Sequence, residues 1–365
     1  MPLFLGRRRL GRIMGRFWPR FWILILVLAV VVLAGIGVGA YALARGFGPT
    51  AGTWTELQGA GTLPLEISSQ VQNDHYAAYD PRIGKQIRCF GGAGFSTPYS
   101  VWACDPATSG WTQLPTSSVA PTSYELALVN DETSGTVIRL GAVYNPTGTD
   151  TWAYDSRSNI WTDLHPSTSP PMYGTVAMAY DPPSRTVIMV GHRGLESHTW
   201  AYDSRVNAWT ELKTNGAPAA RIAAAMAYDK ASGRLILFGG LGHLERTYGA
   251  LLSETWAFDS GTHTWVELKP APSPPARGFA TMAYDEALGK PILFGGGAMG
   301  KMFRDTWAYD SVSNTWTKLR TDGSPAALDY ASMFYDPVSR RMIVTGERMK
   351  GLSLTGLFEA WALSL

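Results

Sequence analysis

The sequence is poor in the residues and motifs that usually mark an active site. It contains two cysteines and six histidines in 365 residues. His192 and His198 lie six residues apart, but no cysteine or carboxylate stands at ligand spacing beside them, so no metal site is predicted. The sequence also lacks a Ser-His-Asp order, a glycine-rich phosphate loop and a His-Glu-x-x-His motif. Nucleophilic and metal-assisted hydrolysis therefore have no support, and we expect no cofactor.

Acidic residues are missing from the first 45 residues, which contain seven arginines. The remainder of the chain contains 24 basic and 29 acidic residues and so has a formal charge of −5. A protein that neutralises nucleic-acid phosphates needs a basic surface. We therefore expect no nucleic-acid partner.

Charged residues of either sign are missing from residues 21–44, which would span about 36 Å as a helix. Six of the seven arginines precede this stretch, and the positive-inside rule then keeps residues 1–20 in the cytoplasm. We expect a single-pass cell-membrane protein with a signal-anchor helix, a linker at 45–52 and an extracytoplasmic domain at 53–365. A cleaved signal peptide is the alternative, because Ala42-Leu43-Ala44 has the small-x-small pattern of a cleavage site, although the apolar stretch is longer than usual.

The rest of the chain repeats one unit six times. Each unit contains a segment resembling Thr-Trp-Ala-Tyr-Asp, with its tryptophan at Trp102, Trp152, Trp200, Trp256, Trp307 and Trp361. A second tryptophan follows nine residues later in the first five units, at Trp111, Trp161, Trp209, Trp265 and Trp316. Ahead of each pair, an apolar run follows an aspartate, at Asp80, Asp131, Asp181, Asp229, Asp285 and Asp336. Large aromatic residues at such regular positions are typical of a core.

The repeated segments are predicted to be strands. Apolar runs such as Leu235–Phe238 are too short for buried helices and lie between turn signals. Four short strands in each unit of about 50 residues describe a blade of a β-propeller. The alanine-rich segment 223–227 suits the crowded innermost strand beside a central channel. The fold class predicted for residues 53–365 is therefore all-β, as a six-bladed propeller.

The sixth unit ends the chain without a second tryptophan, while an unmatched Trp54-Thr55-Glu56-Leu57 precedes the first unit. We expect this N-terminal segment to supply the outer strand of the last blade. Such a pairing closes the ring and removes the sheet edges that an open array would expose.

These repeats resemble the Kelch family over about residues 53–365. The resemblance lies in apolar strands that end in Gly-Gly, as at Gly91-Gly92, Gly239-Gly240 and Gly295-Gly296, followed by the two tryptophan segments. Three units depart from Gly-Gly, with Gly141-Ala142, Gly191-His192 and Gly346-Glu347. The resemblance implies a propeller, and propellers of this kind include both binding modules and enzymes.

Segment lengths indicate which face of the propeller carries function. The distance from each aspartate to the second Gly-Gly position is 11 or 12 residues, whereas the next step, to the first tryptophan, ranges from 8 to 16. Variable loops on a rigid scaffold are where binding usually occurs. The candidate binding residues at this face are His243, Arg246, Tyr248, Lys301, Arg304, Arg348, Lys350, Arg221 and Arg277. The alternative is an ordinary solvated loop surface.

Two function classes remain open. One is a membrane-anchored binding module for a protein partner or an anionic glycan, which requires only loops on a rigid disc. The other is a sugar-acting enzyme resembling the Kelch-type sialic-acid epimerases, which requires an acid and a base near one ligand. Glu245, Glu254 and Asp305 could supply carboxylates if they converge. The cross-linked Tyr-Cys pair of the Kelch-type copper-radical oxidases cannot be matched here.

Cys89 and Cys104 fall in the second and third strands of the first blade. These strands should be antiparallel neighbours, and the expected compartment is oxidising. A cross-strand disulfide is therefore a candidate, with two small buried thiols as the alternative. Geometry decides between them.

Overall fold

The computed structural model describes residues 51–57, 77–90, 100–108, 110–144, 147–244, 247–298, 300–350 and 353–365. The chain divides into two compact units, Met1–Pro49 and Thr50–Leu365. The predicted membrane helix at 21–44 lies outside the described residues. Among the residues that are described, no helix has the length and apolarity needed to span a bilayer.

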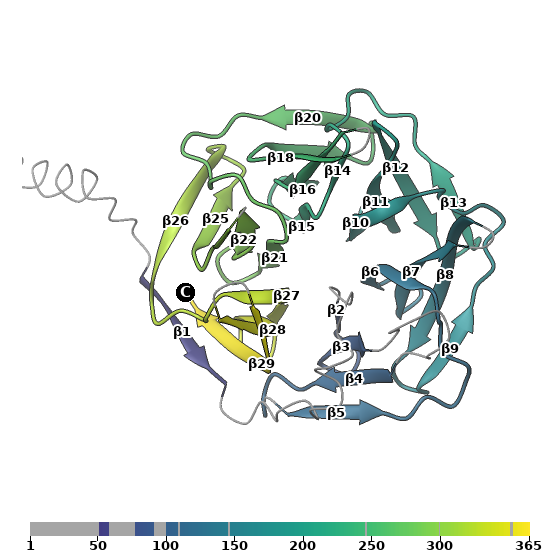
Figure 1. Ribbon diagram of the computed structural model, residues 1–365, viewed down its shortest axis with the longest axis horizontal. Helices are drawn as coiled ribbons and strands as arrows, with labels where there is room; N and C mark the ends of the chain where they lie inside the picture. Colours follow the sequence, from purple (N-terminus) through teal and green to yellow (C-terminus); the bar gives the residue numbers. More distant parts are fainter. Residues whose placement is uncertain are drawn as a thin grey trace, which may run out of the picture. The chain divides into compact units, whose positions relative to one another are not determined.

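The described residues of the second unit form strands arranged around a central channel (Figure 1). Blade one is a four-stranded sheet of β2 (Ala77–Asp80), β3 (Lys85–Phe90), β4 (Ser100–Cys104) and β5 (Trp111–Leu114). Blade two consists of β6 (Tyr124–Asp131), β7 (Thr136–Tyr144), β8 (Thr147–Asp155) and β9 (Ile160–Asp163). Blade three consists of β10 (Tyr173–Asp181), β11 (Thr186–Arg193), β12 (Glu196–Asp203) and β13 (Ala208–Glu211). Blade four consists of β15 (Ala225–Asp229), β16 (Arg234–Phe238), β19 (Thr255–Asp259) and β20 (Thr264–Leu268), with a small added sheet of β14 (Arg221–Ile222), β17 (Leu241–Leu244) and β18 (Thr247–Leu251).

Blades five and six join into one eight-stranded sheet. Blade five consists of β21 (Thr281–Asp285), β22 (Lys290–Phe294), β25 (Thr306–Asp310) and β26 (Thr315–Asp322), with a small hairpin of β23 (Gly297–Ala298) and β24 (Lys301–Met302). Blade six consists of β27 (Leu328–Asp336), β28 (Arg341–Lys350), β29 (Ser353–Ser364) and β1 (Ala51–Glu56). The prediction of an all-β propeller with six repeated units is confirmed.

The N-terminal strand closes the ring as the sequence predicts. β1 pairs antiparallel with β29, with Trp54 opposite Leu363 and Glu56 opposite Trp361. It also pairs in parallel with the end of β26, which joins it to blade five. Trp54 is 3% exposed and its indole Nε1 donates to Thr306 Oγ1 at 3.1 Å. Trp54 thus occupies the place of the second tryptophan that the sixth repeat lacks.

The outer tryptophans join neighbouring blades in a repeated way. Trp209, Trp265 and Trp316 each donate from Nε1 to a buried threonine hydroxyl of the preceding blade, at 2.9 to 3.0 Å. The accepting threonines are Thr151, Thr199 and Thr255. Each threonine directly precedes the first tryptophan of its blade, so the paired tryptophan segments form inter-blade contacts as well as core.

The repeated aspartates terminate the inner strands. All six are 2% exposed or less, and they accept hydrogen bonds from backbone N–H groups two or three residues further on. For example, Asp229 accepts from the N–H groups of Ala231 and Ser232 and from the Ser232 hydroxyl. A short carboxylate side chain that satisfies its own turn in this way is a common turn device. This explains why the turns at this end of every blade have nearly the same length.

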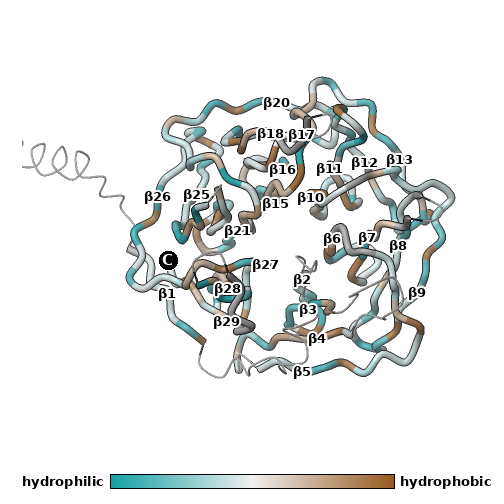
Figure 2. The backbone as a smooth tube through the Cα atoms, viewed as in Figure 1, coloured by the Kyte–Doolittle hydropathy of each residue, from teal (hydrophilic) through white to brown (hydrophobic). Residues whose placement is uncertain are grey.

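Apolar clusters fill the spaces between adjacent blades. One cluster between blades three and four includes Ile188, Val190, Leu235 and Leu237, all at most 3% exposed. In Figure 2, apolar segments gather on inner and middle strands such as β15 and β16, and hydrophilic stretches follow the outer rim. The core is therefore distributed around the ring, one layer for each pair of blades.

Candidate functional site

Hairpins and connections opposite the aspartate turns form what we call the variable-loop face. The structure places the β7–β8, β11–β12, β17–β18 and β28–β29 hairpins and the small β23–β24 hairpin there. These hairpins differ in length from blade to blade, whereas the aspartate turns at the opposite end, the constant-turn face, do not. The predicted division of the propeller into two unlike faces is therefore visible in its connections.

Arg221 and Arg277 lie at this end of blades four and five, but both are buried. Arg221 is 3% exposed and donates to Glu254 Oε2 at 2.6 Å and to the Gly239 carbonyl at 3.0 Å. Arg277 is fully buried and donates to Asp305 Oδ1 at 2.6 Å and to the Gly295 carbonyl at 2.8 Å. Both guanidinium groups therefore hold the Gly-Gly turn and the following strand together inside their own blade.

The carboxylates of these pairs belong to a repeated unit. Glu254 and Asp305 each accept a hydrogen bond from the indole two residues later, Trp256 and Trp307, at 3.0 and 2.9 Å. Burial acts to raise the pKa of both carboxyls, but the hydrogen bonds from arginine and tryptophan outweigh it and lower each pKa below its ordinary value. Both groups are ionised ion-pair partners.

The two carboxylates do not converge. Glu254 and Asp305 occupy equivalent places in separate blades, and each is paired with the arginine of its own blade. Glu245 lies outside the described residues. Among the residues that are described, this face therefore shows no acid and base brought together around one ligand position, which is what the enzyme alternative requires.

The remaining basic candidates differ in how far they are committed to contacts within the protein. Arg304 is exposed, but its guanidinium donates to the carbonyls of Pro325 and Ser324 at 2.8 and 3.2 Å and so fastens the connection to blade six. Arg348 forms an ion pair with Glu359, whose side chain is 5% exposed. Lys301 and Lys350 are exposed.

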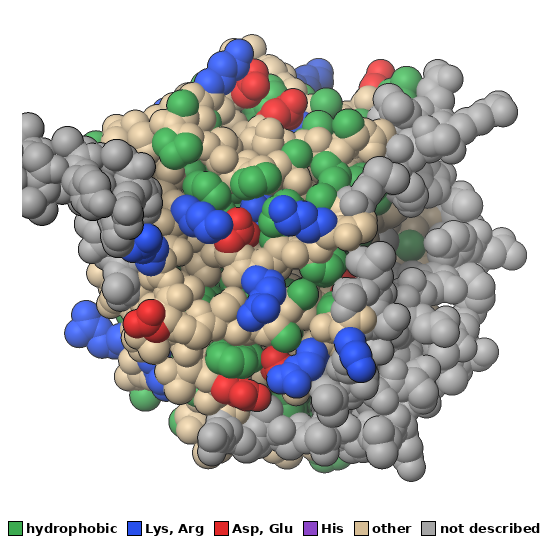
Figure 3. Space-filling view, turned by 60° about the vertical axis from the view of Figure 1, so that its left-hand side comes forward, with side chains coloured by type: hydrophobic (Ala, Val, Ile, Leu, Met, Phe, Trp, Pro, Cys, Tyr) green, Lys and Arg blue, Asp and Glu red, His purple; other side chains and the backbone are tan. Residues whose placement is uncertain are grey.

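The structure brings Lys301 close to one of the buried arginines. Lys301 Nζ lies 4.9 Å from the centre of the Phe303 ring, and the Arg277 guanidinium carbon lies 3.9 Å from the same centre. Arg246 and the side chains of His243 and Tyr248 lie outside the described residues. Figure 3, which brings the side with β25 and β26 forward, shows basic side chains interspersed with acidic and apolar ones.

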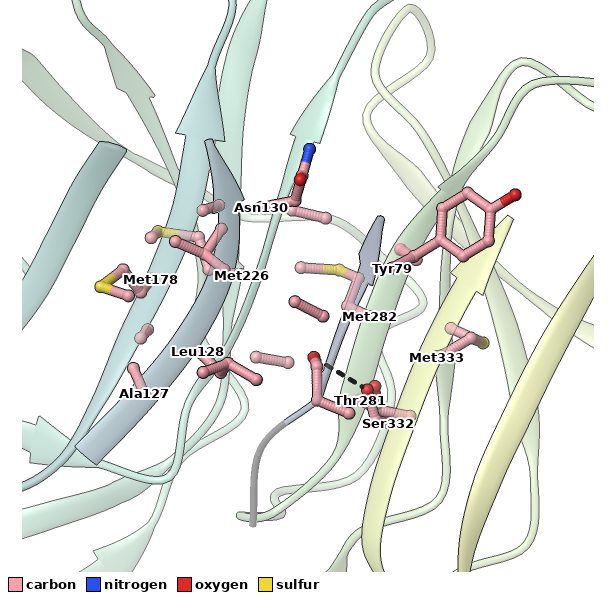
Figure 4. A pocket seen from close by; sticks show the side chains of 18 of the residues that line it. Tyr79, Ala127, Leu128, Asn130, Met178, Met226, Thr281, Met282, Ser332 and Met333 are labelled. Atoms are coloured by element: carbon pink, nitrogen blue, oxygen red, sulfur yellow. Dashed lines mark hydrogen bonds between the residues drawn. The ribbon is translucent and has the colours of Figure 1, made fainter. Parts of the chain in front are cut away.

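A central channel runs between the six inner strands and encloses a cavity of about 450 Å³ (Figure 4). Its lining is dominated by alanines, among them Ala127, Ala177 and Ala225, together with Met178, Met226, Met282 and Met333. The prediction that alanine-rich first strands lie at the crowded centre is confirmed. At the variable-loop end the lining includes Ala223, Phe279 and Asp329.

Phe279 is a residue of this face that the sequence argument missed. Its side chain is 44% exposed and it lines the channel. A comparison of repeats four and five could have found it, because Ala223 and Phe279 each follow the repeated arginine by two residues. An aromatic residue at a position where the other repeat has alanine was the available signal.

The candidate disulfide needs a correction, because the structure does not join Cys89 to Cys104 and both side chains are buried. Cys89 lies opposite Val101, and Cys104 lies opposite Gln86. Since successive side chains of a strand point to opposite faces, this register places the two thiols on different faces of the blade. Burial raises the pKa of Cys104 to about 12, so it stays a neutral thiol.

Comparison with known proteins agrees with the repeat pattern. A family model of the KLHDC2/KLHL20/DRC7 Kelch-repeats domain matches residues 184–363, which cover the last strands of blade three and blades four to six. No curated protein gives a significant match. The paired tryptophans and the closed ring extend the same architecture over the remaining blades. The match supports a Kelch-repeat family for this chain, with residues 184–363 similar to the family model.

Proposed function

We propose that this protein is a single-pass membrane protein whose extracytoplasmic Kelch propeller binds a protein partner through its variable-loop face. Kelch propellers commonly bind protein partners, and the described residues supply a rigid disc with one uniform and one variable face. The observation that carries the proposal is this asymmetry. Six equivalent aspartate turns stand on one side, and hairpins of unequal length stand on the other.

The chemistry of the variable-loop face favours a macromolecular partner. Lys301, Lys350 and the apolar Leu195, which is 50% exposed at the tip of the β11–β12 hairpin, extend into solvent from three different blades. Binding sites spread over several loops of a rigid scaffold suit a broad contact with a protein surface. Arg221 and Arg277 contribute by fixing the bases of these loops rather than by contact.

Membrane anchoring is the second part of the proposal and rests on the sequence. Residues 21–44 carry no charge, and the preceding arginines favour a cytoplasmic N-terminus. Protease treatment of intact cells or spheroplasts tests the orientation. We expect the propeller to be digested or released from outside, and protection of the propeller in intact cells would contradict the assignment.

Site-specific photo-crosslinking in native membranes tests the binding face. A photoreactive amino acid replaces Leu195 on the variable-loop face or, as the matched control, Val206, which is 69% exposed at a constant turn of the same blade. We expect a discrete crosslinked protein from position 195 and none from position 206. Crosslinks from position 206 alone, or from neither position, would contradict the proposal.

An anionic glycan is the second candidate ligand, because exposed lysines also suit acidic sugars. Binding of the full-length, detergent-solubilised chain to an array of acidic and neutral glycans separates the two ideas. A salt-sensitive signal that falls when Lys301 and Lys350 are both replaced by alanine would favour the glycan. Absence of such binding together with a protein crosslink at position 195 would favour the protein partner.

A further inference from the structure

The strand that leads into the propeller begins at the constant-turn face of blade six. One row of residues crosses all four strands of this blade: Tyr335, Met342, Leu363 and Trp54. One step nearer the turn, Arg341 pairs with Asp336 and Thr53 pairs with Ser364. Neighbouring strands lie about 4.8 Å apart, so two strand spacings, on the order of 10 Å, separate Thr53 from Arg341. The chain therefore enters the propeller beside the β27–β28 turn.

A short connection joins this point to the expected membrane helix. The helix is expected at 21–44 and β1 begins at Ala51, so residues 45–50 span the interval. These residues lie outside the described ones, but their number limits the distance, because the steps from 44 to 51 reach at most about 25 Å in an extended chain. With the helix in a bilayer, the constant-turn end of blade six is thus held close to lipid.

The β27–β28 turn next to the entry point is apolar and basic at its surface. Its sequence is Asp336-Pro337-Val338-Ser339-Arg340, followed by Arg341. Val338 is 84% exposed, and Pro337 and Arg340 are exposed as well. Asp336, the acidic residue of the turn, is 2% exposed and accepts from the backbone N–H groups of Val338 and Ser339. The groups that this turn presents outward are therefore apolar side chains and arginines.

The equivalent turn in blade three, across the ring from blade six, shows what is particular to blade six (Figure 1). Both turns have the pattern Asp-Pro-x-Ser-Arg, and Arg185 and Arg340 both adopt a positive φ, +59° and +56°. The two turns differ at two positions. Blade six has Val338 in place of Pro183, and it has Arg341 where blade three has a buried threonine. The second arginine is therefore found at the blade that receives the chain from the N-terminal side.

The constant turns of the other blades are less suited to lipid phosphates. Glu132 in blade two and Glu286 in blade five are exposed at the equivalent hairpins, and Lys230 of blade four is paired with Glu286 at 2.5 Å. In blade one, Arg82 forms an ion pair with Asp80 at 2.8 Å. Exposed carboxylates are repelled by anionic lipid, and cations that are already paired gain little from it.

Apolar side chains flanked by arginines suit the headgroup region of a bilayer. Small apolar groups partition into the boundary between headgroups and acyl chains, and basic residues beside them are attracted by anionic lipid. A guanidinium group also matches the geometry of phosphate, to which it donates two hydrogen bonds. The turn of blade six combines both kinds of group at the point where the chain is tethered.

We propose that the β27–β28 turn of blade six is a membrane-contact site. Val338 enters the headgroup region, and Arg340 and Arg341 bind phosphates of the lipid bilayer that holds the chain's own helix. This inference rests on the proposed membrane anchor and adds an orientation to it. The constant-turn face of blade six lies on lipid, and the variable-loop face points away from the bilayer, where a partner reaches it.

The test uses the full-length chain reconstituted in phosphatidylcholine vesicles that contain phosphatidylglycerol. A fluorophore is attached to a cysteine introduced as Pro337→Cys or, as the matched control, as Pro182→Cys at the same position of the blade-three turn. The native Cys89 and Cys104 are buried and do not compete for the label. Quenching by lipids with a nitroxide on the headgroup reports which turn lies at the membrane surface.

We expect strong quenching of the label at position 337 and weak quenching at position 182. Arg340→Asn combined with Arg341→Gln should lower the ratio of lipid-bound to free turn by about 30-fold, since each cation near an anionic bilayer contributes about fivefold. Asparagine tolerates the positive φ at position 340. Arg185→Asn is the matched control and should leave the quenching at position 337 unchanged.

Two results would overturn the inference in a chain that stays with the vesicles after an alkaline carbonate wash. One is quenching at position 337 that is no greater than at position 182, and the other is quenching at position 337 that persists in the double arginine variant. The two labelled positions are compared with the arginines intact, so a loss of stability in the double variant does not affect the first result. A chain that washes off the vesicles would reject the membrane anchor, and this inference with it.

Discussion

The contact between blades three and four and the contact between blades six and one differ in chemistry, although the same strands form both. Between blades three and four, Val190 faces Leu235 and Leu237 in one apolar cluster. At the seam between blades six and one, Thr345 stands where Val190 does, and Gln86 and Arg88 stand where the two leucines do.

The polar side chains at the seam are completely buried and linked to one another. Thr345 Oγ1 donates to Gln86 Oε1 at 2.7 Å, and Arg88 Nη2 lies 3.5 Å from Thr345 Oγ1. Apolar packing at the seam is divided into two small groups on either side of this layer, one around Phe358 and one around Phe334. Blades six and one are therefore joined by buried hydrogen bonds between two small apolar groups, whereas blades three and four share one continuous apolar cluster.

Deleting residues 53–57 should have the largest effect. The deletion removes most of β1 and its whole pairing with β29, and it removes the buried Trp54, whose loss alone costs about 3–5 kcal/mol. Thermal or denaturant unfolding of the full-length chain measures the loss. Deleting 46–50, which precede the strand, is the control and should leave stability unchanged. Equal stability of the two deletions would contradict ring closure by β1.

The next largest effect is the loss of stability when an outer tryptophan is replaced, which we compare between a regular contact and the seam. Trp209 is 1% exposed and donates to Thr151, so Trp209→Ala should cost about 3–5 kcal/mol. Trp111 is half-buried, and its Nε1 has no hydrogen-bond partner among the described residues. Trp111→Ala should therefore cost clearly less in the same unfolding measurement, and a larger loss than for Trp209→Ala would reverse the comparison.

The buried polar layer gives a third test. Thr345→Val leaves Gln86 Oε1 without its donor and should destabilise by about 1–3 kcal/mol. Adding Gln86→Val removes the partner as well and makes this part of the seam resemble a regular contact. Because removing both partners is nearly neutral, the double variant should recover most of the loss. If the losses of the two single variants add up in the double variant, Thr345 and Gln86 do not stabilise the seam through their mutual hydrogen bond.

The smallest expected effect is a gain in stability. Trp161 Nε1 is buried with no hydrogen-bond partner in the described part of the chain, and the position that holds threonine in blades two to five is Val101 in blade one. Val101→Thr should supply the missing acceptor and stabilise by about 0.5–1.5 kcal/mol. Val187→Thr, which buries a hydroxyl within an apolar cluster, is the control and should destabilise. A loss of stability in both variants would contradict the inference that a threonine at this position accepts a stabilising hydrogen bond from the tryptophan of the next blade.

Features that repeat were predictable from the sequence, because a repeated spacing reports a repeated backbone. Trp54 could be assigned to the sixth blade because its segment matches the second tryptophan segments of the first five repeats, and the sixth repeat has no such segment. Side-chain direction was not predictable from spacing alone. Arg221 and Arg277 were expected at the mouth as ligand-binding groups, but the Gly-Gly turns and nearby carboxylates draw them into the blade. Cys89 and Cys104 required the strand register to show that they lie on different faces.

The most direct test of the account is the labelling of introduced cysteines with a membrane-impermeant maleimide. The native Cys89 and Cys104 are buried, so Leu195→Cys and Val206→Cys report on the two faces without interference. The account predicts that both positions react in the purified chain, and that in intact cells position 206 reacts while position 195 is protected by the partner. Protection of position 206 with free reaction at position 195 would contradict the proposed face. If both positions react after lysis but neither reacts in intact cells, the extracytoplasmic assignment is contradicted.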